Sequence, residues 1–379
     1  MKNVIIAAYA RSPFTPAKKG ELASIRADDM TAQVVKKLVL ESAINPDDIE
    51  DLILGCAFPE GEQGMNLARL VVYLAQLPIS IAGMTVNRFC GSSMQAIHIA
   101  AGAIQMNAGE AFICAGVESM SRIPMGGFNY MPNPELYNHY PQAYISMGET
   151  AENLAKKYQI TRAEQETFAL LSQQKTQTAQ QKGLLVNEIV PIITAKGKQI
   201  TLDGCLRPES TAQGMADLNP AFIKNGSVTA ATSSPLTDGA AAVLICSENY
   251  ADTNGLNKLA RIKAVAVSAC QPEIMGIGPV VASQKALQRA GLSLNDIDIV
   301  ELNEAFASQS LAVLKELPIA AEKLNIDGGA IALGHPLGAT GARITGKAAS
   351  LLQRENKQFA LATQCIGGGQ GIATILEAI

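Results

Sequence analysis

The second half of the chain repeats the pattern of the first half, with an offset of about 250 residues. Residues 45–58 (NPDDIEDLILGCAF) and 294–306 (LNDIDIVELNEAF) each combine acidic residues, an apolar run and an Ala-Phe ending. Two further pairs keep the same offset: glycine-rich turns that lead into helices near Thr85 and Asn325, and apolar strands near Phe112 and Phe359. Solenoid repeats have periods of roughly 20–50 residues. A repeat this long therefore predicts two similar halves that face each other.

The repeated unit alternates short apolar runs with helical patterns. In the first copy, strands are predicted at residues 4–8, 52–54, 85–87 and 111–115. Helices are predicted at 28–43, 66–75 and 92–107, and the first of them opens with two acidic residues. This alternation is typical of the α/β class.

A change of composition separates an insert from the repeated units. From Ser119 to about Asn225 the chain is richer in Pro, Tyr, Met, Asn and Gln, and residues 122–148 show no clear period, which predicts an irregular loop. A Thr-Arg-Ala-Glu capping box opens a predicted helix over 161–182. The core pattern resumes near Val228. We therefore expect an N-terminal half (1–118 with 226–255), an inserted loop domain (119–225) and a C-terminal half (256–379).

Composition and charge exclude several classes of function. Apolar residues make up 48% of the chain and charged residues 17%, which is typical of a folded protein with a large core. The net charge of -4 gives no overall basic field for binding nucleic acid. No apolar run is long enough to span a membrane, and residues 4–8 are too short for the apolar region of a signal peptide. We expect a cytoplasmic protein without membrane insertion.

Metal and nucleotide sites are not expected. The seven cysteines are scattered without a CxxC pair, and there are only three histidines. Residues 341–347 fit GxxxxGK, but Ala348 stands where a phosphate-binding loop needs Ser or Thr, and no full GxGxxG follows a strand. We expect His98 to pack within its helix and His139 to lie at the surface.

Cys90 is the first candidate for chemistry. It lies in the stretch VNRFCGSSMQAIHIAAGAI (86–104), between a predicted strand and a predicted helix. The free N–H groups and the dipole at a helix N-terminus favour a thiolate. Gly91, Ser92 and Ser93 would let the backbone approach a ligand. A buried structural cysteine at a helix start fits this local pattern equally well.

Three other stretches carry candidates. His335 lies on a turn in GGAIALGHPLGATG (328–341), where a general base or an oxyanion donor is a better interpretation than core packing. Cys365 ends a strand in QCIGGGQG and is either a second thiol of the same cleft or a strand-end cysteine. Asn303 ends a predicted strand in NEAF, where ligands of α/β folds bind, although taken alone it is better explained as a turn former.

Taken together, these stretches resemble the motifs of the thiolase family. VNRFCGSSMQA resembles the nucleophile motif, NEAFA the asparagine motif, GGAIALGHPLGATGAR the histidine motif and CIGGGQG the second-cysteine motif. They stand in the family's order and spacing, and the resemblance covers nearly the whole chain. It implies an α/β thiolase fold, in which two duplicated halves form five layers, α-β-α-β-α, with a loop domain inserted in the first half.

The resemblance also implies a reaction and a set of catalytic residues. Cys90 would attack the keto carbon of a 3-ketoacyl-CoA after His335 takes its proton. Cys365 would protonate the acetyl-CoA enolate that is released, and the acyl group on Cys90 would pass to a second CoA. The reverse reaction is a Claisen condensation. In the family, one oxyanion hole is made by the histidine and a water held by the asparagine, here Asn303, and the other by the N–H groups of Cys90 and Gly367.

The resemblance implies CoA as a co-substrate and no tightly bound cofactor. The family's pantetheine contacts correspond to Ser234, Met147, Met275 and Phe306. Two departures favour the degradative fatty acid β-oxidation type over the biosynthetic short-chain acetyl-CoA acetyltransferase. Ser146 stands where short-chain biosynthetic members usually have His, and no Lys or Arg lies between Arg122 and Lys156 to hold the CoA phosphate.

Other interpretations remain open at this stage. The family's habit predicts a homodimer or a homotetramer, and association with a subunit of a β-oxidation multienzyme complex is an open addition. A decarboxylating condensing enzyme usually carries two histidines, or His and Asn, beside its cysteine, so Cys365 argues against that class. A non-catalytic thiolase-like binding protein generally lacks a catalytic residue, whereas all four are present here.

Overall fold

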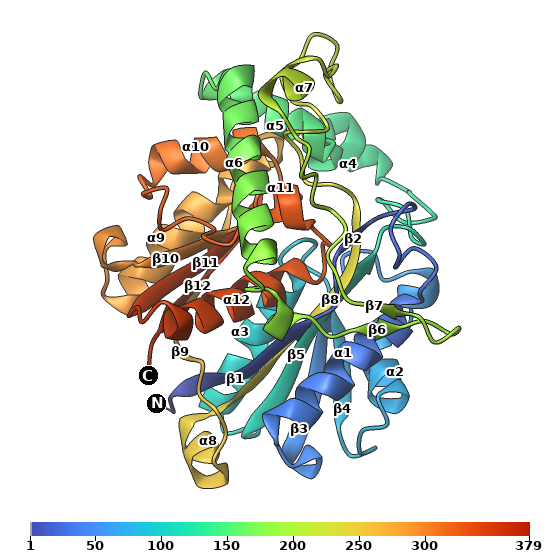
Figure 1. The fold of residues 1–379 in the computed structure, drawn as a ribbon, viewed down its shortest axis with the longest axis vertical. Helices are drawn as coiled ribbons and strands as arrows, with labels where there is room; N and C mark the ends of the chain where they lie inside the picture. Colours follow the sequence, from blue (N-terminus) through green and yellow to red (C-terminus); the bar gives the residue numbers. More distant parts are fainter. Residues whose placement is uncertain (1) are drawn as a thin grey trace.

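Both halves of the chain build a sheet with the same strand order (Figure 1). The computed structural model describes residues 2–379. In the first half β3 pairs in parallel with β4 and β5, while β8 runs antiparallel to β5 and β1. The order across this sheet is β4 (Ala82–Val86), β3 (Ile49–Gly55), β5 (Ala111–Ser119), β8 (Thr237–Ser247) and β1 (Val4–Arg11), and β2 (Thr15–Pro16) also pairs with β8.

The second half repeats this arrangement. β10 pairs in parallel with β11, and β12 runs antiparallel to both β11 and β9. Leu324 forms a parallel bridge to Val300 and so takes the place that β4 has in the first sheet. The order is therefore Leu324, β10 (Ile299–Leu302), β11 (Phe359–Ile366), β12 (Gln370–Glu377) and β9 (Ala260–Ala269). The two sheets join where Ile5 and Ile6 of β1 pair with β9.

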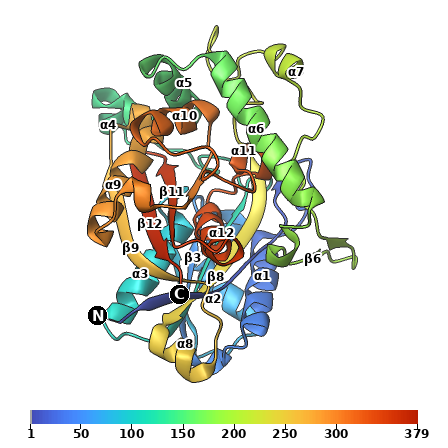
Figure 2. The same ribbon diagram turned by 60° about the vertical axis from the view of Figure 1, so that its left-hand side comes forward.

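Helices lie outside and between the two sheets, which gives five layers (Figures 1 and 2). Helices α1 (Ala27–Ser42) and α2 (Leu67–Leu74) cover the outer face of the first sheet. Helices α9 (Gly278–Ala290) and α10 (Ala307–Glu316) cover the second half. Helices α3 (Ser92–Gln105) and α12 (Thr340–Arg354) pack on each other in the centre. The expected α-β-α-β-α arrangement is confirmed.

Each helical layer encloses its own apolar core. The outer core of the first half includes Val34 of α1 and Leu52 of β3, and the outer core of the second half includes Leu287 of α9. The central core joins Ile97 of α3 to residues of α12 and of both sheets. Burying one such large apolar side chain stabilises the fold by roughly 1.5–3 kcal/mol. The repeated strand and helix pattern of the sequence therefore corresponds to the helical layers and sheets that enclose these three cores.

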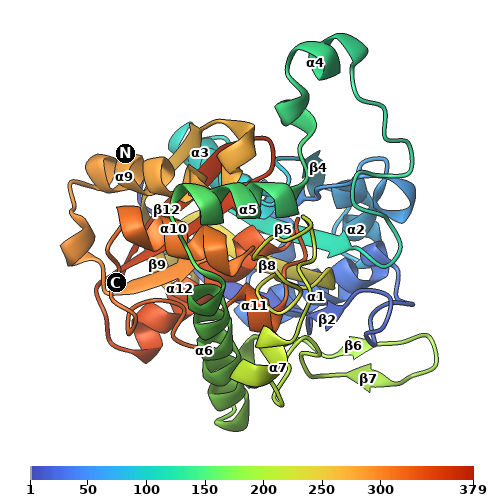
Figure 3. The same cartoon turned by 90° about the horizontal axis from the view of Figure 1, so that it is seen from above.

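The insert between β5 and β8 contains more regular structure than the sequence indicated. Ser146 and Thr161 each form a capping box, at the start of α5 and of α6. Residues 122–148 were expected to be irregular, but they contain α4, which lies on an arm that projects from the rest of the molecule (Figure 3). The elements are α4 (Pro134–His139), α5 (Met147–Lys157), α6 (Arg162–Gln181), α7 (Ala212–Ala216) and the hairpin β6 (Ile192–Ile193) and β7 (Gln199–Ile200).

Other element boundaries differ from the sequence expectations by a few residues. The strand predicted at 52–54 runs from Ile49 to Gly55, and the strand predicted at 85–87 ends at Val86. The remaining elements are short: α8 (Glu248–Asn254), α11 (Ala330–Leu333), and 3₁₀ helices at Pro46–Asp48, Gly61–Gln63, Pro141–Tyr144, Val186–Glu188, Pro272–Ile277 and Leu294–Asp296. None of the helices described combines the length and apolarity needed to cross a bilayer.

A buried ionic network ties the insert to both halves. Arg11 of β1 binds Asp203 through two bonds of 2.7 and 2.8 Å and Glu188 at 2.8 Å. Lys347 of α12 binds Glu188 at 2.9 Å and Asp327 at 2.6 Å. The two cations hold the pKa of Glu188 below its usual value although burial opposes this. The network therefore fixes where the insert sits above the sheets.

Candidate active site

Cys90 lies on a tight turn between β4 and α3. Phe89 takes φ +43°, which is strained for a side chain other than glycine. The Ser92 hydroxyl closes the turn by donating to the Phe89 carbonyl at 2.6 Å and accepting the Arg88 N–H at 2.9 Å. Gly91 is the N-cap of α3, and the Cys90 side chain is partly exposed. The turn therefore presents the sulfur at the N-terminal end of a central helix.

The resting Cys90 side chain is a thiol and not a thiolate. Desolvation raises its pKa to about 11, and the charge of Glu118 acts in the same direction. The backbone N–H groups of Gly367 and of Cys90 itself act in the opposite direction. The N–H groups at the helix start favour the thiolate, but desolvation outweighs them, so a base must remove the proton of the Cys90 thiol. Both N–H groups nevertheless face the sulfur.

His335 is buried on the turn between α11 and α12, after Gly334 at φ +102°. Its backbone N–H donates to Thr237 Oγ1 at 3.0 Å, and its ring Nδ1 lies 2.6 Å from Thr340 Oγ1. Ring Nε2 lies 3.3 Å from Asn303 Nδ2. Burial, and then the charge of Arg343, lowers the pKa of His335 to about 3. The imidazole is therefore neutral at pH 7 and free to accept a proton.

Asn303 follows β10 and is completely buried. Its backbone N–H donates to the Thr363 carbonyl at 3.0 Å, which joins it to the neighbouring strand β11. Its side-chain nitrogen faces His335, and its Oδ1 has no hydrogen-bond partner among the described residues. A buried amide with an unpaired polar atom is costly unless something polar uses it. This group therefore fits a binding role better than a turn-forming one.

Cys365 and Gly367 lie at the end of β11 and on the turn that follows. Cys365 is buried, and burial together with the nearby Cys90 raises its pKa well above the usual value. The two thiols are thus in one site. The Gln364 side chain donates to the Cys90 carbonyl, which links the two cysteine segments directly. A Cβ added to Gly367 would lie 3.4 Å from Met147 Sδ.

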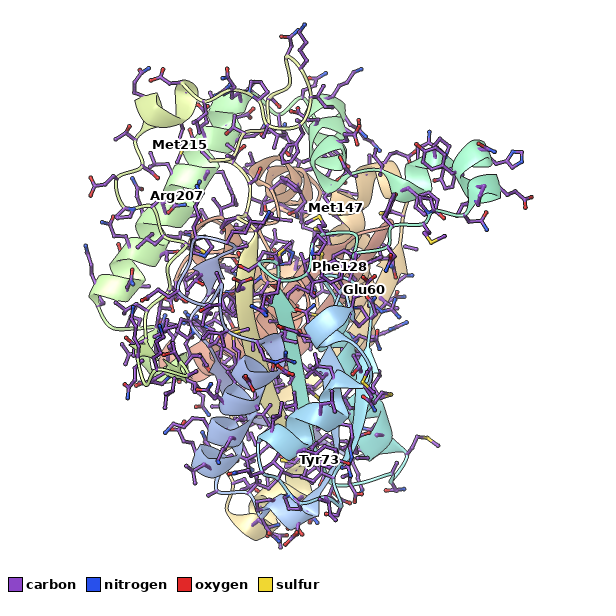
Figure 4. All side chains as sticks on the ribbon, turned by 90° about the vertical axis from the view of Figure 1, so that its right-hand side faces the viewer. Glu60, Tyr73, Phe128, Met147, Arg207 and Met215 are labelled. Atoms are coloured by element: carbon purple, nitrogen blue, oxygen red, sulfur yellow. The ribbon has the colours of Figure 1, made fainter. Side chains whose placement is uncertain are left out.

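An apolar wall extends from Cys365. Met147, Met275, Phe306 and Cys365 belong to one cluster of side chains. Ser234 adjoins it, because its N–H and its hydroxyl donate to the Ala305 carbonyl at 3.0 and 3.1 Å. Figure 4 labels Met147, the first residue of α5 in the insert, above the ends of the strands. All four residues expected to contact pantetheine are therefore near Cys365.

A second apolar cluster contains Cys90. Its buried members are Ala57, Met120 and Leu337, and Phe58 and Cys90 both pack against them. The rings of Phe58 and Phe89 lie 6.0 Å apart. Cys90 therefore packs on an apolar cluster that is separate from the cluster of Cys365.

Two buried carboxylates that the sequence analysis missed support the site. Glu118 at the end of β5 accepts the N–H groups of Ala57 and Gly338, both at 2.9 Å, and so joins the loop after β3 to the loop of His335. Glu304 accepts Asn325 Nδ2 at 2.8 Å and the Ser172 hydroxyl at 2.6 Å. Glu304 directly follows Asn303 in the sequence. A charged residue next to a candidate site amide was a sequence signal that could have predicted the supporting role of Glu304.

The other histidines lie outside this site, as expected. His98 is buried in α3, with Nε2 2.8 Å from Thr374 Oγ1 of β12, and His139 is exposed at the end of α4. Residues 341–347 lie inside α12, so the GxxxxGK match is not a phosphate-binding loop. Within residues 2–379, no group of three or more His, Cys, Asp or Glu residues is placed to hold a metal ion.

Comparison with known proteins decides the family. The model of the thiolase N-terminal domain matches residues 4–249, and that of the thiolase C-terminal domain matches residues 256–378. The chain belongs to the thiolase family. It is 45% identical over 389 residues to the 3-ketoacyl-CoA thiolase of Bacillus subtilis (strain 168), and 46% identical over 387 residues to that of Vibrio vulnificus (strain CMCP6). Both alignments cover 100% of each chain.

Solved thiolase structures have the same fold. Human mitochondrial 3-ketoacyl-CoA thiolase matches with a TM-score of 0.91 at 38% identity, covering 100% of this chain and 99% of that chain. A structure of the human protein in complex with CoA also scores 0.91, at 38% identity, and covers 98% of that chain. The acetyl-CoA acetyltransferase of Bacillus anthracis matches equally well, at 0.91 and 38%, with coverage of 100% and 99%. The resemblance found in the sequence is confirmed.

Proposed function

We propose that this thiolase cleaves 3-ketoacyl-CoA with CoA, giving acetyl-CoA and a shortened acyl-CoA, through an acyl group on Cys90. The observation that carries this proposal is that the Cys90 thiol lies close enough to Cys365 to affect its pKa and packs on the cluster of Leu337, which belongs to the same turn as the neutral base His335. The thiolase family consists of acyltransferases, and several relatives are named 3-ketoacyl-CoA thiolase. CoA is then a co-substrate, and no tightly bound cofactor is needed.

The first half of the reaction forms the acyl-enzyme. His335 Nε2 takes the proton of the Cys90 thiol as the sulfur attacks the keto carbon. The N–H groups of Cys90 and Gly367 face the sulfur and would bind the oxygen that becomes negative. The carbon–carbon bond then breaks, and its electrons form the acetyl-CoA enolate. His335 and a water held by Asn303 would bind the enolate oxygen, while Cys365 gives its proton to the enolate carbon.

The second half of the reaction returns the site to its starting state. The Cys365 thiolate takes the proton of an incoming CoA thiol, and the CoA sulfur attacks the acyl group on Cys90. The Cys90 sulfur leaves and recovers its proton from the His335 imidazolium. Each group ends in its original protonation state, so all protons are accounted for. Reversal of these steps is the condensation of two acetyl-CoA molecules to acetoacetyl-CoA.

Met147, Met275, Phe306 and Ser234 form the proposed binding surface for pantetheine. Its mainly apolar character suits an extended chain with few charges. The apolar cluster of Ala57, Met120 and Leu337 lies beside Cys90 and is suited to the acyl group. The relatives named 3-ketoacyl-CoA thiolase support the degradative, β-oxidation type.

A biosynthetic short-chain acetyl-CoA acetyltransferase is the second candidate. It is favoured by the equally good structural match to the Bacillus anthracis enzyme of that name. Ser146 argues against this candidate, because it caps α5 where short-chain members usually have His. Residues 123–155 also carry no Lys or Arg for the phosphate of CoA.

Organisation and assembly belong to the same proposal. We divide the chain into an N-terminal half (1–118 with 226–255), an inserted loop domain (119–225) and a C-terminal half (256–379). The gap between the two family models, at residues 249–256, supports the last boundary.

A homodimer or homotetramer is proposed, since β4 is a sheet edge with Ala82 exposed. Seven unpaired cysteines favour a reducing compartment such as the cytoplasm.

The test is CoA-dependent cleavage of 3-ketoacyl-CoAs with four to sixteen carbons, measured for the wild type and for Cys90→Ala. Activity that is lost in the variant supports thiolase chemistry. A profile extending to long chains supports the β-oxidation type, whereas cleavage of the four-carbon substrate alone supports the biosynthetic type. Absence of activity at every length, in a folded and reduced protein, contradicts the proposal.

A further inference from the structure

His335 is held at two points by threonine hydroxyls. Thr340 Oγ1 lies 2.6 Å from the ring Nδ1, and Thr237 Oγ1 accepts the backbone N–H of His335 at 3.0 Å. Thr340 and Thr237 are both buried. The two contacts differ in kind, because only the first involves a ring nitrogen that can lose or gain a proton.

Each threonine hydroxyl has a carbonyl to which it can donate its single proton. Thr340 Oγ1 lies 3.0 Å from the Pro336 carbonyl, and Thr237 Oγ1 lies 2.6 Å from the Pro235 carbonyl. A carbonyl oxygen only accepts, so these bonds use the hydroxyl protons. Thr340 Oγ1 can then only accept a hydrogen bond from Nδ1. The proton in this short contact is therefore bound to Nδ1 of the imidazole ring.

Asn303 faces the other ring nitrogen with the same consequence. The amide atom nearest Nε2 is the nitrogen Nδ2, at 3.3 Å, and an amide nitrogen donates. Both neighbours of the ring therefore require Nδ1 to carry the proton and Nε2 to carry the lone pair. Nε2 is also the atom that the proposed function needs as the base for Cys90.

We propose that Thr340 is a positioning residue that holds His335 in the Nδ1–H tautomer, so that Nε2 can take the proton of Cys90. This inference rests on the proposed function for its catalytic consequence, but the tautomer itself is a property of the resting protein. Thr340 acts through His335 and contacts no reacting atom.

The fold fixes this contact relative to the nucleophile. Thr340 is the first residue of α12, and Cys90 directly precedes the N-cap of α3. The two helices pack closely at their starts, since a Cβ on Gly341 would lie only 2.3 Å from the Met94 backbone nitrogen. Thr340 therefore belongs to α12, which packs on α3, the helix that follows Cys90. A shift of α12 would move α3 with it.

A neutral hydroxyl suits a base that must return its proton. After transfer, Nε2 carries the proton from Cys90, and Nδ1 keeps its own proton and its bond to Thr340. A carboxylate in the place of Thr340 would stabilise the imidazolium and raise the pKa of His335. The hydroxyl orients the ring without adding negative charge, so the imidazolium readily protonates the departing Cys90 sulfur.

The experiment combines Thr340→Val, which keeps the shape but removes the acceptor, with Thr340→Ser, which keeps the hydroxyl. The protein has only three histidines, so ¹⁵N-histidine NMR can resolve the tautomer of each ring. We expect wild type and Thr340→Ser to show Nδ1–H at His335, and Thr340→Val to show Nε2–H or a mixture. For 3-ketoacyl-CoA cleavage, kcat should fall roughly 10–100-fold in Thr340→Val with little change in KM, and Thr340→Ser should restore most of it.

Thr237→Val is the matched control, because it removes a hydroxyl contact to the His335 backbone and leaves the ring contact in place. It should keep the Nδ1–H signal. Nε2–H in the wild type, or an unchanged tautomer in Thr340→Val, overturns the proposal. Equal losses of kcat in the Ser and Val variants also overturn it, since they would indicate a packing role. A wild type with Nδ1–H but no thiolase activity contradicts the proposed function and leaves the tautomer assignment standing.

Discussion

The buried histidine His98 makes the fold sensitive to acid. Burial lowers its pKa from about 6.5 to about 3, and Arg88 acts in the same direction. Above pH 6.5 the ring is neutral in both the folded and the unfolded chain, so the full stability is present. As the pH falls from 6.5 towards 3, His98 becomes protonated in the unfolded chain but stays neutral in the folded chain. The free energy of unfolding therefore decreases.

The size of this loss follows from the shift. Each pH unit between the two pKa values costs about 1.4 kcal/mol for each group, so at pH 4.5 His98 costs about 2.7 kcal/mol. His335, with its pKa lowered to about 3, adds a similar cost. Together they remove about 5 kcal/mol, a large share of the roughly 5–15 kcal/mol that stabilises a typical domain.

The assay is urea unfolding at pH 7.0 and pH 4.5 for wild type, His98→Gln and His139→Gln. Glutamine can still bond to Thr374 but cannot be protonated, so His98→Gln should lose about 2.7 kcal/mol less than wild type between the two pH values. His139 is exposed on α4, and its replacement serves as the control for adding a glutamine. An identical loss in wild type and His98→Gln would refute the reasoning.

Three further predictions concern catalysis and packing. Cys365→Ala should lower thiolytic turnover by roughly 10²–10⁴-fold because it removes the proton donor, while Cys90 should still react with iodoacetamide; turnover near the wild-type rate would exclude that role. Arg11→Met should lower the free energy of unfolding by roughly 3–5 kcal/mol in urea titrations, because Asp203 and Glu188 lose a buried partner; a loss under 1 kcal/mol would show that Lys347 and relaxation compensate. Gly341→Ala should lower the melting temperature and thiolytic activity together, because the new Cβ meets the α3 backbone; an unchanged melting temperature would contradict the packing argument.

The duplicated fold could be predicted because the repeat is visible in strand and helix periods. Residues 45–58 and 294–306 occupy matching places in the two sheets, as the pattern indicated. The short helix α4 was missed, although Asn133 and Pro134 carry the usual signals of an N-cap and a first helical residue. Its brief apolar pattern gave no period to detect.

The residues proposed for the site could be named from the sequence, whereas the burial that sets their pKa values could not. The helix terminus at Cys90 is a local feature, whereas the desolvation that raises its pKa comes from segments far away in sequence. Thr340, Glu118 and Glu304 were missed for the same reason, since only the folded chain shows which loops they hold. Glu304 and Thr340 lie inside the asparagine and histidine motifs, but a motif does not show which groups such supporting residues contact.

The most direct test of the proposed chemistry is mass spectrometry of the protein after brief mixing with a 3-ketoacyl-CoA in the absence of free CoA. The account predicts release of acetyl-CoA and a shortened acyl group on the peptide that contains Cys90, with none on Cys365. The acyl group should disappear when CoA is added. No acyl group on any cysteine, or an acyl group on Cys365 alone, would contradict the account.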